Sequence, residues 1–363
     1  MTAETVCVRR TARRGRRARN RDVEPAMTLK SDAGTATLEQ VAVRAGVSRS
    51  TVSRVVNGGR RVSPEALAAV EKAIAELKYV PNRAARSLAS RQTHAIALVV
   101  PEDTMRFFGD PYFAAIVAGI NDRISASPYM LGLFIASQDP DDKAASYVSS
   151  GSVDGTLVVS HHTSDEFVGR IASTTPVVYG GRPMHPRDGD RWVDVDNVAG
   201  GRLATRHLLG LGRRRIAMIT GPQSMAASVD RLAGCRAELA EAGLEPVAVE
   251  DGDFSAAGAA RAMERVLDSG AAPDAVFIAS DLMARGALAA LQRAGVRVPD
   301  EIAVIGFDDS PVASSVSPPL TTIRQPSRAQ GAAMADVLLA VLSGENPPRE
   351  TLLDLELVVR ASA

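Results

Sequence analysis

The chain has 363 residues, of which 45% are hydrophobic and 23% are charged, so it can bury a large core and is long enough for more than one domain. Uninterrupted apolar runs such as residues 95–100 and 114–118 are far shorter than the roughly 20 residues that cross a bilayer, and no membrane span is expected. The two cysteines, Cys7 and Cys235, lie far apart and away from any histidine cluster, which argues against a disulfide framework and a zinc site.

The zero net charge conceals an uneven distribution. Residues 1–91 carry 19 Lys or Arg against 8 Asp or Glu, a net charge of +11, whereas residues 92–363 carry a net charge of −11. Clustered cations favour a polyanionic partner, because a protein that neutralises phosphates releases their counterions. The sequence therefore predicts a nucleic-acid-binding segment at the N-terminal end and an acidic remainder with a different task.

Residues 1–35 predict a disordered leader rather than a folded element. They hold eight Arg between Arg9 and Arg21 and too few apolar residues to offset the entropy of ordering. No apolar segment follows these arginines, so the pattern is not that of an export signal, and we expect a cytoplasmic protein. Met27 is an alternative translation start, and the leader is then either an artefact or a non-specific DNA arm.

The first periodic segments predict three short helices. Thr37 and Gln40 form a capping box before a helix that ends at Gly46, and Ser48 is placed to cap a second helix. Two short helices joined by a glycine-containing turn are typical of a helix-turn-helix. Ser63 and Pro64 then begin a third helix. The outward face of the second helix is rich in Arg, Ser and Thr, the residue types that reach base edges and phosphates.

Residues 82–90 predict one further short helix. About nine residues form a marginal helix in water, so this segment needs a partner, either its copy in a dimer or DNA.

The acidic remainder has the pattern of an α/β fold. Apolar strands are predicted at residues 95–100, 130–136, 155–159, 177–179, 215–220, 275–279 and 302–305, each followed by a segment of helical length. This repeat predicts parallel sheets, and its restart near residues 192–197 favours two lobes. Ligands in such folds bind where strands end and helices begin, so a cleft between the lobes is the expected site.

Signatures of enzymes are not found in this region. The sequence has no phosphate-binding loop, dinucleotide fingerprint, nucleophile elbow or zinc-protease motif. The adjacent His161 and His162 are interpreted as a solvated loop rather than as metal ligands, and Asp308 and Asp309 as caps of the following turn. We therefore expect no catalytic residue, cofactor or metal.

Several runs resemble the DNA-binding headpiece of the lactose-repressor (LacI/GalR) family of bacterial transcription regulators: residues 37–42, 46–57, 62–63 and 79–88. The resemblance implies that the second helix enters the major groove while the hinge helix enters the minor groove, where Leu88 would kink the DNA. An alternative for Leu88 is an apolar contact with the core. The implied base-reading residues are Arg49, Ser50 and Arg54. Ser48, Thr51, Ser53 and Asn57 would lie near phosphates, and Asn82 and Arg83 would join Leu88 in the hinge contact.

The rest of the chain resembles the core of the same family, which is similar to periplasmic sugar-binding proteins. The supporting runs include residues 110–113, 195–197, 231–234, 252–254, 279–281 and 305–309. The effector residues that the resemblance implies are Tyr112, Phe113, Arg231, Phe254 and Asp281, with Arg182 as a pocket or lobe-bridging residue. The alternatives are an ion pair between Arg231 and Asp281, and a core role for Tyr112 and Phe113.

This chain departs from the family pattern at two places near that pocket. The loop at residues 101–110 is long and carries two extra aromatics, and the run Gly180-Gly181-Arg182 stands where the lactose repressor has an acidic pocket residue. The identity of the sugar therefore does not transfer.

The sequence thus predicts an all-α helix-turn-helix headpiece and an α/β core of two periplasmic-binding-protein-like lobes. The expected parts are a leader (1–35), a DNA-binding domain (36–80), a hinge (81–93) and an effector-binding, dimerising core (94–363). The implied function is a dimeric regulator, controlled by a small molecule such as a sugar, that binds a palindromic operator. The chain carries no tetramer-forming leucine heptad at its end. Two rival interpretations are a sugar receptor with a vestigial head and a sugar- or nucleotide-modifying enzyme with a DNA arm.

Overall fold

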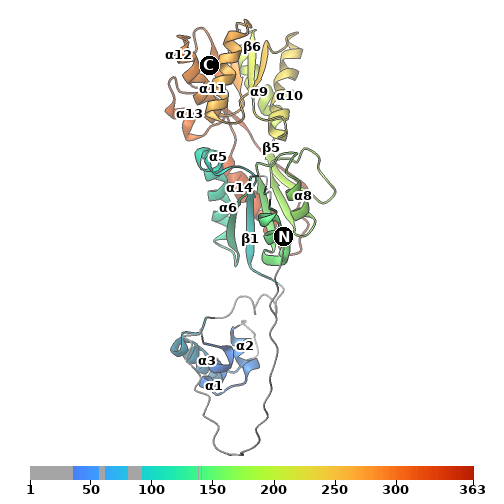
Figure 1. Cartoon of the computed structure of the whole chain (residues 1–363), viewed down its shortest axis with the longest axis vertical. Coiled ribbons are helices and arrows are strands. Elements are labelled where there is room, and N and C mark those ends of the chain that lie inside the picture. Colours follow the sequence, from blue (N-terminus) through green and yellow to red (C-terminus); the bar gives the residue numbers. More distant parts are fainter. Residues whose placement is uncertain (1–35, 57–61, 81–91, 138, 140) are drawn as a thin grey trace, which may run out of the picture. The chain divides into compact units, whose positions relative to one another are not determined.

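The computed structural model describes residues 36–56, 62–80, 92–137, 139 and 141–363. The chain divides into two compact units, residues 1–82 and 83–363 (Figure 1). None of the helices in these described ranges is long and apolar enough to cross a membrane.

The first unit contains the three expected helices, α1 (Leu38–Ala45), α2 (Arg49–Val56) and α3 (Pro64–Leu77). Thr37 Oγ1 accepts a hydrogen bond from the Gln40 backbone N–H, and Gln40 Oε1 accepts one from the Thr37 N–H, which is the predicted capping box. Gly46 ends α1 with a φ of 67°, a conformation that glycine adopts without strain. Val41, Val52 and Val70, one from each helix, are fully buried and form the centre of this small core.

The second unit begins with a lobe built on a parallel sheet of order β11-β5-β4-β3-β1-β2. Its strands are β1 (Ala95–Val100), β2 (Met130–Ile135), β3 (Gly155–Val159), β4 (Val177–Gly180), β5 (Arg191–Val195) and β11 (Glu350–Leu353). Its helices are α5 (Thr104–Gly109), α6 (Pro111–Ile124), α7 (Lys143–Tyr147), α8 (Glu166–Ala172) and α14 (Ser327–Leu342), with a short π-helix at Val148–Ser152.

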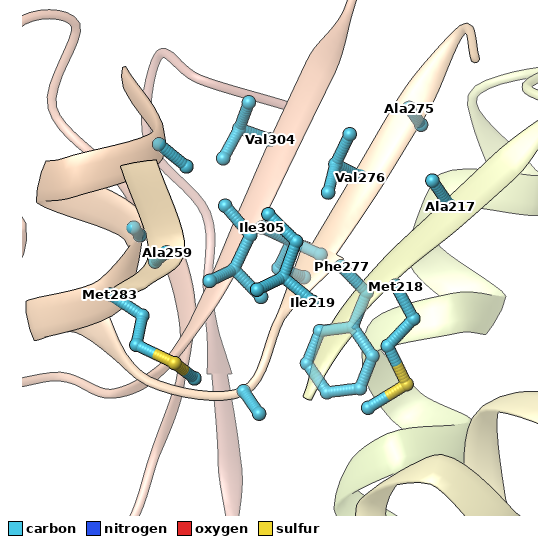
Figure 2. Close-up of a cluster of buried hydrophobic side chains, with 14 of the residues drawn as sticks. Ala217, Met218, Ile219, Ala259, Ala275, Val276, Phe277, Met283, Val304 and Ile305 are labelled. Atoms are coloured by element: carbon cyan, nitrogen blue, oxygen red, sulfur yellow. The ribbon is translucent and has the colours of Figure 1, made fainter. Parts of the chain in front are cut away.

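The second lobe has a sheet of order β12-β10-β9-β8-β6-β7. Its strands are β6 (Ile216–Thr220), β7 (Ala248–Asp251), β8 (Ala275–Ile278), β9 (Ala303–Asp308), β10 (Thr321–Arg324) and β12 (Glu356–Val358). Its helices are α9 (Asn197–Gly210), α10 (Ala226–Glu241), α11 (Ala256–Asp268), α12 (Asp281–Arg293) and α13 (Pro311–Ser315). Figure 2 shows the core of this lobe, where Ile219, Phe277 and Ile305 come from neighbouring strands and Met283 and Ala259 from the flanking helices.

The predicted fold class is confirmed, and all seven predicted strands are present within a few residues of their expected bounds. Five strands were not predicted: β5, β7, β10, β11 and β12. The last of these pairs antiparallel with β10, so the second sheet is not wholly parallel. The chain passes between the lobes after β5, after β10 and after β11, and each passage leads the backbone past the carboxyl ends of the central strands.

Helices α6 and α14 of the first lobe pack backbone against backbone through two glycines (Figure 1). A Cβ atom at Gly119 would lie 1.9 Å from the carbonyl oxygen of Arg328, and one at Gly331 would lie 2.2 Å from that of Ile116. Neither backbone can yield without separating the helices, so only glycine fits at these positions.

We therefore expect Gly119→Ala to destabilise the core by about 1 to 3 kcal/mol, because the added methyl group overpacks the helix contact. Gly210→Ala is the matched control. Gly210 also lies in a helix, but nothing is within 4 Å of the added Cβ, so helix propensity should raise stability by up to about 1 kcal/mol. Urea unfolding measures both changes. Equal stability of the two variants would contradict the close backbone contact between α6 and α14.

Candidate functional site

Helix α2 carries the residues that were assigned to DNA. Ser48 caps this helix, since its Oγ accepts from the Thr51 backbone N–H at 3.1 Å, and the same hydroxyl is hydrogen-bonded to the hydroxyls of Ser50 and Thr51. Val52 faces the core and is fully buried, whereas Arg49 and Arg54 are exposed. One short helix therefore presents Arg49, Ser50, Thr51, Ser53 and Arg54 together. Asn57, Asn82, Arg83 and Leu88 lie outside the described residues.

The structure adds one charged residue to this surface that sequence reasoning did not single out. Glu39 of α1 forms an ion pair with Arg49, with 3.0 Å between Oε1 and Nε. Its position beside the first residue of α2 follows from the helix-turn-helix geometry rather than from any sequence motif.

A cavity of about 680 Å³, open to solvent, lies between the two lobes of the core. Its walls come from the carboxyl ends of the strands and the helices that follow them, as expected for parallel sheets. Of the six predicted effector residues it brings five together: Tyr112, Phe113, Arg182, Arg231 and Phe254. The other lining residues are Arg106, Asp110, Ser160, His161, Gly180, Gly181, Asp194, Met225, Ala226, Ala227, Ser280, Asp308, Gln325 and Gln330.

Arg231 lines this cavity and is 95% buried. Its Nε donates to Asn197 Oδ1 at 2.9 Å, and its Nη1 donates to the carbonyl oxygen of Ala279 at 2.6 Å. The guanidinium lies 3.6 Å from the centre of the Phe307 ring. Burial lowers the pKa of Arg231, while the carboxylates of Asp308 and Asp194 oppose that shift. The group is held rigidly and is compensated by charge from both lobes.

Three carboxyl groups line the same cavity, of which Asp110 and Asp194 are buried and Asp308 is half-buried. Burial raises the pKa of Asp110, Asp194 and Asp308, and Arg231 opposes the rise at Asp194 and Asp308. Gln330 adds a further acceptor, because its Oε1 is buried without a hydrogen-bond partner among the described residues, while its Nε2 donates to the Val193 carbonyl. The cavity is therefore rich in acceptors and matches a ligand with many hydroxyl donors.

Asp281, the sixth residue assigned to the effector, is not among the residues that line the cavity. It is fully buried, its Oδ1 accepts from the Thr322 hydroxyl at 2.7 Å, and its Oδ2 accepts from the Ser310 backbone N–H at 2.7 Å. Asp281 thus ties α12 to β10 and to the start of α13. Its neighbour Ser280, the N-cap of α12, lines the cavity instead.

The turn after β9 also differs from its interpretation as a simple cap. Ser310 caps α13, Asp309 accepts from Arg324 and Arg360, and Asp308 lines the cavity with its Oδ1 bonded to Gln325 Nε2 at 2.6 Å. The signal that could have identified Asp308 is its position directly at the carboxyl end of a central strand.

Three residues with strained backbone conformations line the cavity. Ser160, Phe254 and Asp308 all line it and have φ values of 62°, 44° and 117°, in a region that residues other than glycine rarely adopt. Such strain persists only where the surroundings enforce it, and it concentrates at ligand sites. A Cβ at Gly221 would lie 2.2 Å from the Phe254 ring, so this glycine leaves the space that the ring occupies.

Phe113 has both roles that the sequence left open for it, a core position and a place in the cavity wall. Phe113 is 98% buried, packs with Phe107 at a ring-centre distance of 5.3 Å, and lines the cavity as well. Phe107 comes from the long loop at residues 101–110, which contains α5 and supplies Arg106 to the cavity wall.

Two arginines bridge the lobes at the cavity. Arg182 of the first lobe forms a bidentate ion pair with Asp230 of α10, with Nη2 at 2.9 and 2.8 Å from the two carboxylate oxygens. Arg106 Nη1 donates to the Asp253 carbonyl at 3.0 Å, and its Nε lies 3.0 Å from Glu102 Oε1. Both guanidinium groups are therefore already paired within the protein.

His161 and His162 do not form a solvated loop. His162 joins the lobes, with Nδ1 2.8 Å from the Ser224 hydroxyl and Nε2 3.2 Å from Glu102, and its pKa is raised by that carboxylate. Burial lowers the pKa of His161 to about 4, so its imidazole is neutral at pH 7. In the described parts of the chain no group of three or more His, Cys, Asp or Glu side chains could hold a metal ion.

A helix-turn-helix unit joined to a two-lobed core with a polar interlobe cavity defines a ligand-responsive DNA-binding protein. Residues 37–82 match the family of bacterial regulatory proteins, lacI family, and residues 205–363 match the periplasmic binding protein-like domain. The chain is 43% identical to the HTH-type transcriptional regulator CelR of Thermobifida fusca over 332 residues, which is 90% of this chain and 98% of that protein. It is 39% identical to the ribose operon repressor of Escherichia coli (strain K12) over 312 residues, or 84% and 92% of the two chains.

Solved structures of transcriptional regulators are also similar to this chain. A transcriptional regulator CelR–cellobiose complex has a TM-score of 0.72 and 41% identity, covering 90% of this chain and 100% of the other. The lac repressor dimer bound to operator and the anti-inducer ONPF has a TM-score of 0.80 and 31% identity, covering 91% and 99%. The chain belongs to the lacI family of bacterial regulatory proteins and is a DNA-binding transcriptional regulator.

The environment of Asp281 predicts that the core loses stability as the pH rises. Burial raises the pKa of Asp281 to about 7 from the model-peptide value of 3.8. An acid with a raised folded-state pKa stabilises the protein fully below the unfolded value, and that contribution is lost as the pH rises through the folded value. Between pH 5 and pH 8, the free energy of unfolding should fall on the order of 2 kcal/mol further in the wild type than in Asp281→Asn.

Urea unfolding at the two pH values measures this difference. Asp300→Asn, at an aspartate whose side chain is 74% exposed, should retain the pH dependence of the wild type. If Asp281→Asn also retains the wild-type pH dependence, Asp281 is ionised in the folded state at pH 5.

Proposed function

We propose that the protein is a dimeric repressor whose headpieces bind a palindromic operator and whose core binds a neutral sugar in the interlobe cavity. The observation that carries the proposal is the cavity itself, where the buried Arg231, three carboxyl groups and the Phe254 ring face one space. Arginine and carboxylates hydrogen-bond to hydroxyl groups, and a flat ring packs against the apolar face of a sugar.

A neutral sugar fits better than a phosphorylated one. Three arginines line the cavity, but Arg182 is paired with Asp230 and Arg106 with Glu102. The positive charge of Arg231 is opposed electrostatically by the carboxyl groups of Asp194 and Asp308. The described lining therefore offers a phosphate no uncompensated positive charge, whereas it offers hydroxyl groups many acceptors.

The relatives support each part of the proposal. CelR has been solved with cellobiose, another relative is the ribose operon repressor, and the lac repressor binds its operator as a dimer. These relatives are regulators, and we propose that this chain likewise catalyses no reaction and acts in the cytoplasm on DNA. We assign DNA binding to residues 36–80, the hinge to residues 81–93 and effector binding with dimerisation to residues 94–363.

Control by the sugar requires that it bind the DNA-competent and DNA-incompetent states with different affinities. A ligand held between two lobes meets this condition when the lobes close around it, because the contacts from both sides form together. An inducer and a corepressor both satisfy the same requirement.

The test is selection of binding sites from random duplex DNA by the full-length protein, followed by titration of the recovered site with a panel of sugars. The proposal predicts a two-fold symmetric site whose affinity changes in the presence of one sugar. Binding without a consensus, governed by salt alone, would overturn it.

Phe254→Ala should weaken sugar binding without weakening operator binding. Removing the ring should weaken sugar binding about 10-fold, because an aromatic contact contributes about 0.5 to 1.5 kcal/mol beyond its buried area, and should leave operator affinity without sugar unchanged. Phe108→Ala is the control, since Phe108 is 76% exposed and does not line the cavity. Calorimetry with the sugar and fluorescence anisotropy with labelled operator measure the two affinities. Undiminished sugar binding by Phe254→Ala would place the effector elsewhere.

Arg49→Ala should relax base preference at one position in each half-site and weaken operator binding by about 1 to 3 kcal/mol per half-site. Arg44→Ala removes the same charge from α1, where Arg44 is paired with Glu76, and should leave base preference intact. Repeating the selection with each variant gives the result. An unchanged consensus for Arg49→Ala would remove this residue from base recognition.

A further inference from the structure

The chain enters the first lobe through a fixed turn just before β1. His94, the residue that precedes β1, has a φ of 51°, a conformation that residues other than glycine rarely adopt. Its carbonyl oxygen accepts from the backbone N–H of Met130 at 2.9 Å, and its ring packs edge-on against the Tyr129 ring with 5.7 Å between the ring centres. Strain of this kind persists only where the surroundings enforce it, so these contacts hold the turn in place.

One carboxylate, that of Asp154, makes three further bonds to this turn. Asp154 stands directly before β3, which is a parallel neighbour of β1, so Asp154 and Thr93 lie at the same edge of the sheet. Its Oδ1 accepts from the Thr93 backbone N–H at 2.7 Å and from the Thr93 hydroxyl at 2.9 Å, and its Oδ2 accepts from the His94 backbone N–H at 2.9 Å. Hydrogen bonds to a carboxylate are roughly twice as strong as those between neutral groups. We call Thr93, His94 and Asp154 the hinge anchor.

The second lobe contains the same device. Asp274 stands directly before β8, and its carboxylate accepts from the backbone N–H groups of Arg214, at 3.2 and 3.0 Å, and Arg215, at 3.0 Å, just before β6. A carboxylate at this place therefore fixes the start of the first strand of a lobe. The two copies differ in what precedes that strand, because β6 follows α9 of its own lobe, whereas β1 follows the segment that joins the core to the headpiece.

The hinge anchor lies at the end of the sheet that faces away from the interlobe cavity. The cavity is built at the carboxyl ends of the strands, whereas the anchor lies at their amino ends, about 20 Å away along the six residues of β1. None of its three residues is among those that line the cavity. The helix that the sequence predicts at residues 82–90 would be separated from Thr93 by two residues only. A turn fixed at Thr93 and His94 therefore sets where the hinge starts and in which direction it leaves the core.

We propose that Asp154 is a positioning residue for operator recognition: by fixing the core end of the hinge in each subunit, it sets the spacing at which the two headpieces meet their half-sites. This inference rests on the proposed dimeric operator binding and adds the residue that selects the half-site spacing. A fixed start restricts the volume that each headpiece explores, which raises its effective concentration at one spacing and lowers it at others. A loosened start spreads the same headpieces over many spacings.

The experiment measures the affinity of full-length variants for three duplexes: the operator recovered by selection, and the same operator with one base pair added or removed at its centre. One base pair shifts a half-site by about 3.4 Å and rotates it by about 35° around the DNA axis. The wild type should bind the two altered duplexes about 10-fold more weakly than the recovered operator, or weaker still. Asp154→Ala should bind the recovered operator about 10-fold more weakly than the wild type does and should discriminate among the three duplexes by about 3-fold or less.

Two milder variants grade the effect. Asp154→Asn keeps one acceptor oxygen and replaces the other with an amide group that only donates, and Thr93→Val removes only the hydroxyl donor. Discrimination among the three duplexes should fall in the order wild type, Thr93→Val, Asp154→Asn, Asp154→Ala. Because Thr93→Val keeps both backbone bonds to the carboxylate, it reports on the hinge anchor even if Asp154→Ala is too unstable to purify.

Asp274→Ala is the matched control. It removes the corresponding carboxylate of the second lobe, so it should lower the stability of the core as Asp154→Ala does and yet keep the wild-type discrimination. Urea unfolding measures the stabilities, and fluorescence anisotropy with labelled duplexes measures the affinities. The inference fails, and operator binding stands, if the wild type tolerates the altered spacing, if discrimination survives in the Asp154 variants, or if Asp274→Ala loses it equally. Recovery of no two-fold symmetric site would overturn the proposed function and this inference together.

Discussion

The cavity depends on one buried charge, the guanidinium of Arg231. A cation this deeply buried is stable only with hydrogen bonds and opposite charge around it, and these come from Asn197, Ala279 and the carboxyl groups of Asp194 and Asp308. Asp194 is the last residue but one of β5 in the first lobe, and Asp308 is the last residue of β9 in the second. Neutralising Arg231 therefore draws both lobes toward one point, and the space beside it is lined by polar groups together with the rings of Phe113 and Phe254.

The same arrangement explains how a ligand can control the protein. Lobe contacts at Arg182–Asp230 and His162–Ser224 lie beside the cavity, so a ligand that fills it acts on the same interface that these bridges hold. The headpiece contributes a separate, small core and a compact set of outward-facing polar side chains on α2. The two units are separate in the fold, so coupling of ligand binding to DNA binding requires a change in the core that reaches the headpiece.

The sequence predicted the helices and strands that short stretches of residues determine by themselves. Caps at Thr37, Ser48 and Ser63 bounded the headpiece helices, and apolar runs located the central strands, because burial on both faces leaves a continuous hydrophobic segment. Edge strands such as β7 and β12 were missed, since they are short and half-exposed. At the cavity, the Asp281 carboxyl group is bonded to Thr322 and Ser310 while Asp308 lines the space, because only the tertiary fold decides which of several polar residues after a strand turns toward the cleft. Gln330 comes from α14, far along the chain, and no local pattern connects it to the cavity.

The central claim is that one ligand in the core and one operator on the headpieces are thermodynamically coupled. The most direct measurement is the Kd of the sugar with and without saturating operator DNA, compared with the Kd of the operator with and without saturating sugar. Linkage requires the two ratios to be equal, and the account predicts a common factor of about 5 to 150. A sugar that binds the cavity with the same Kd in the presence and absence of operator would contradict it.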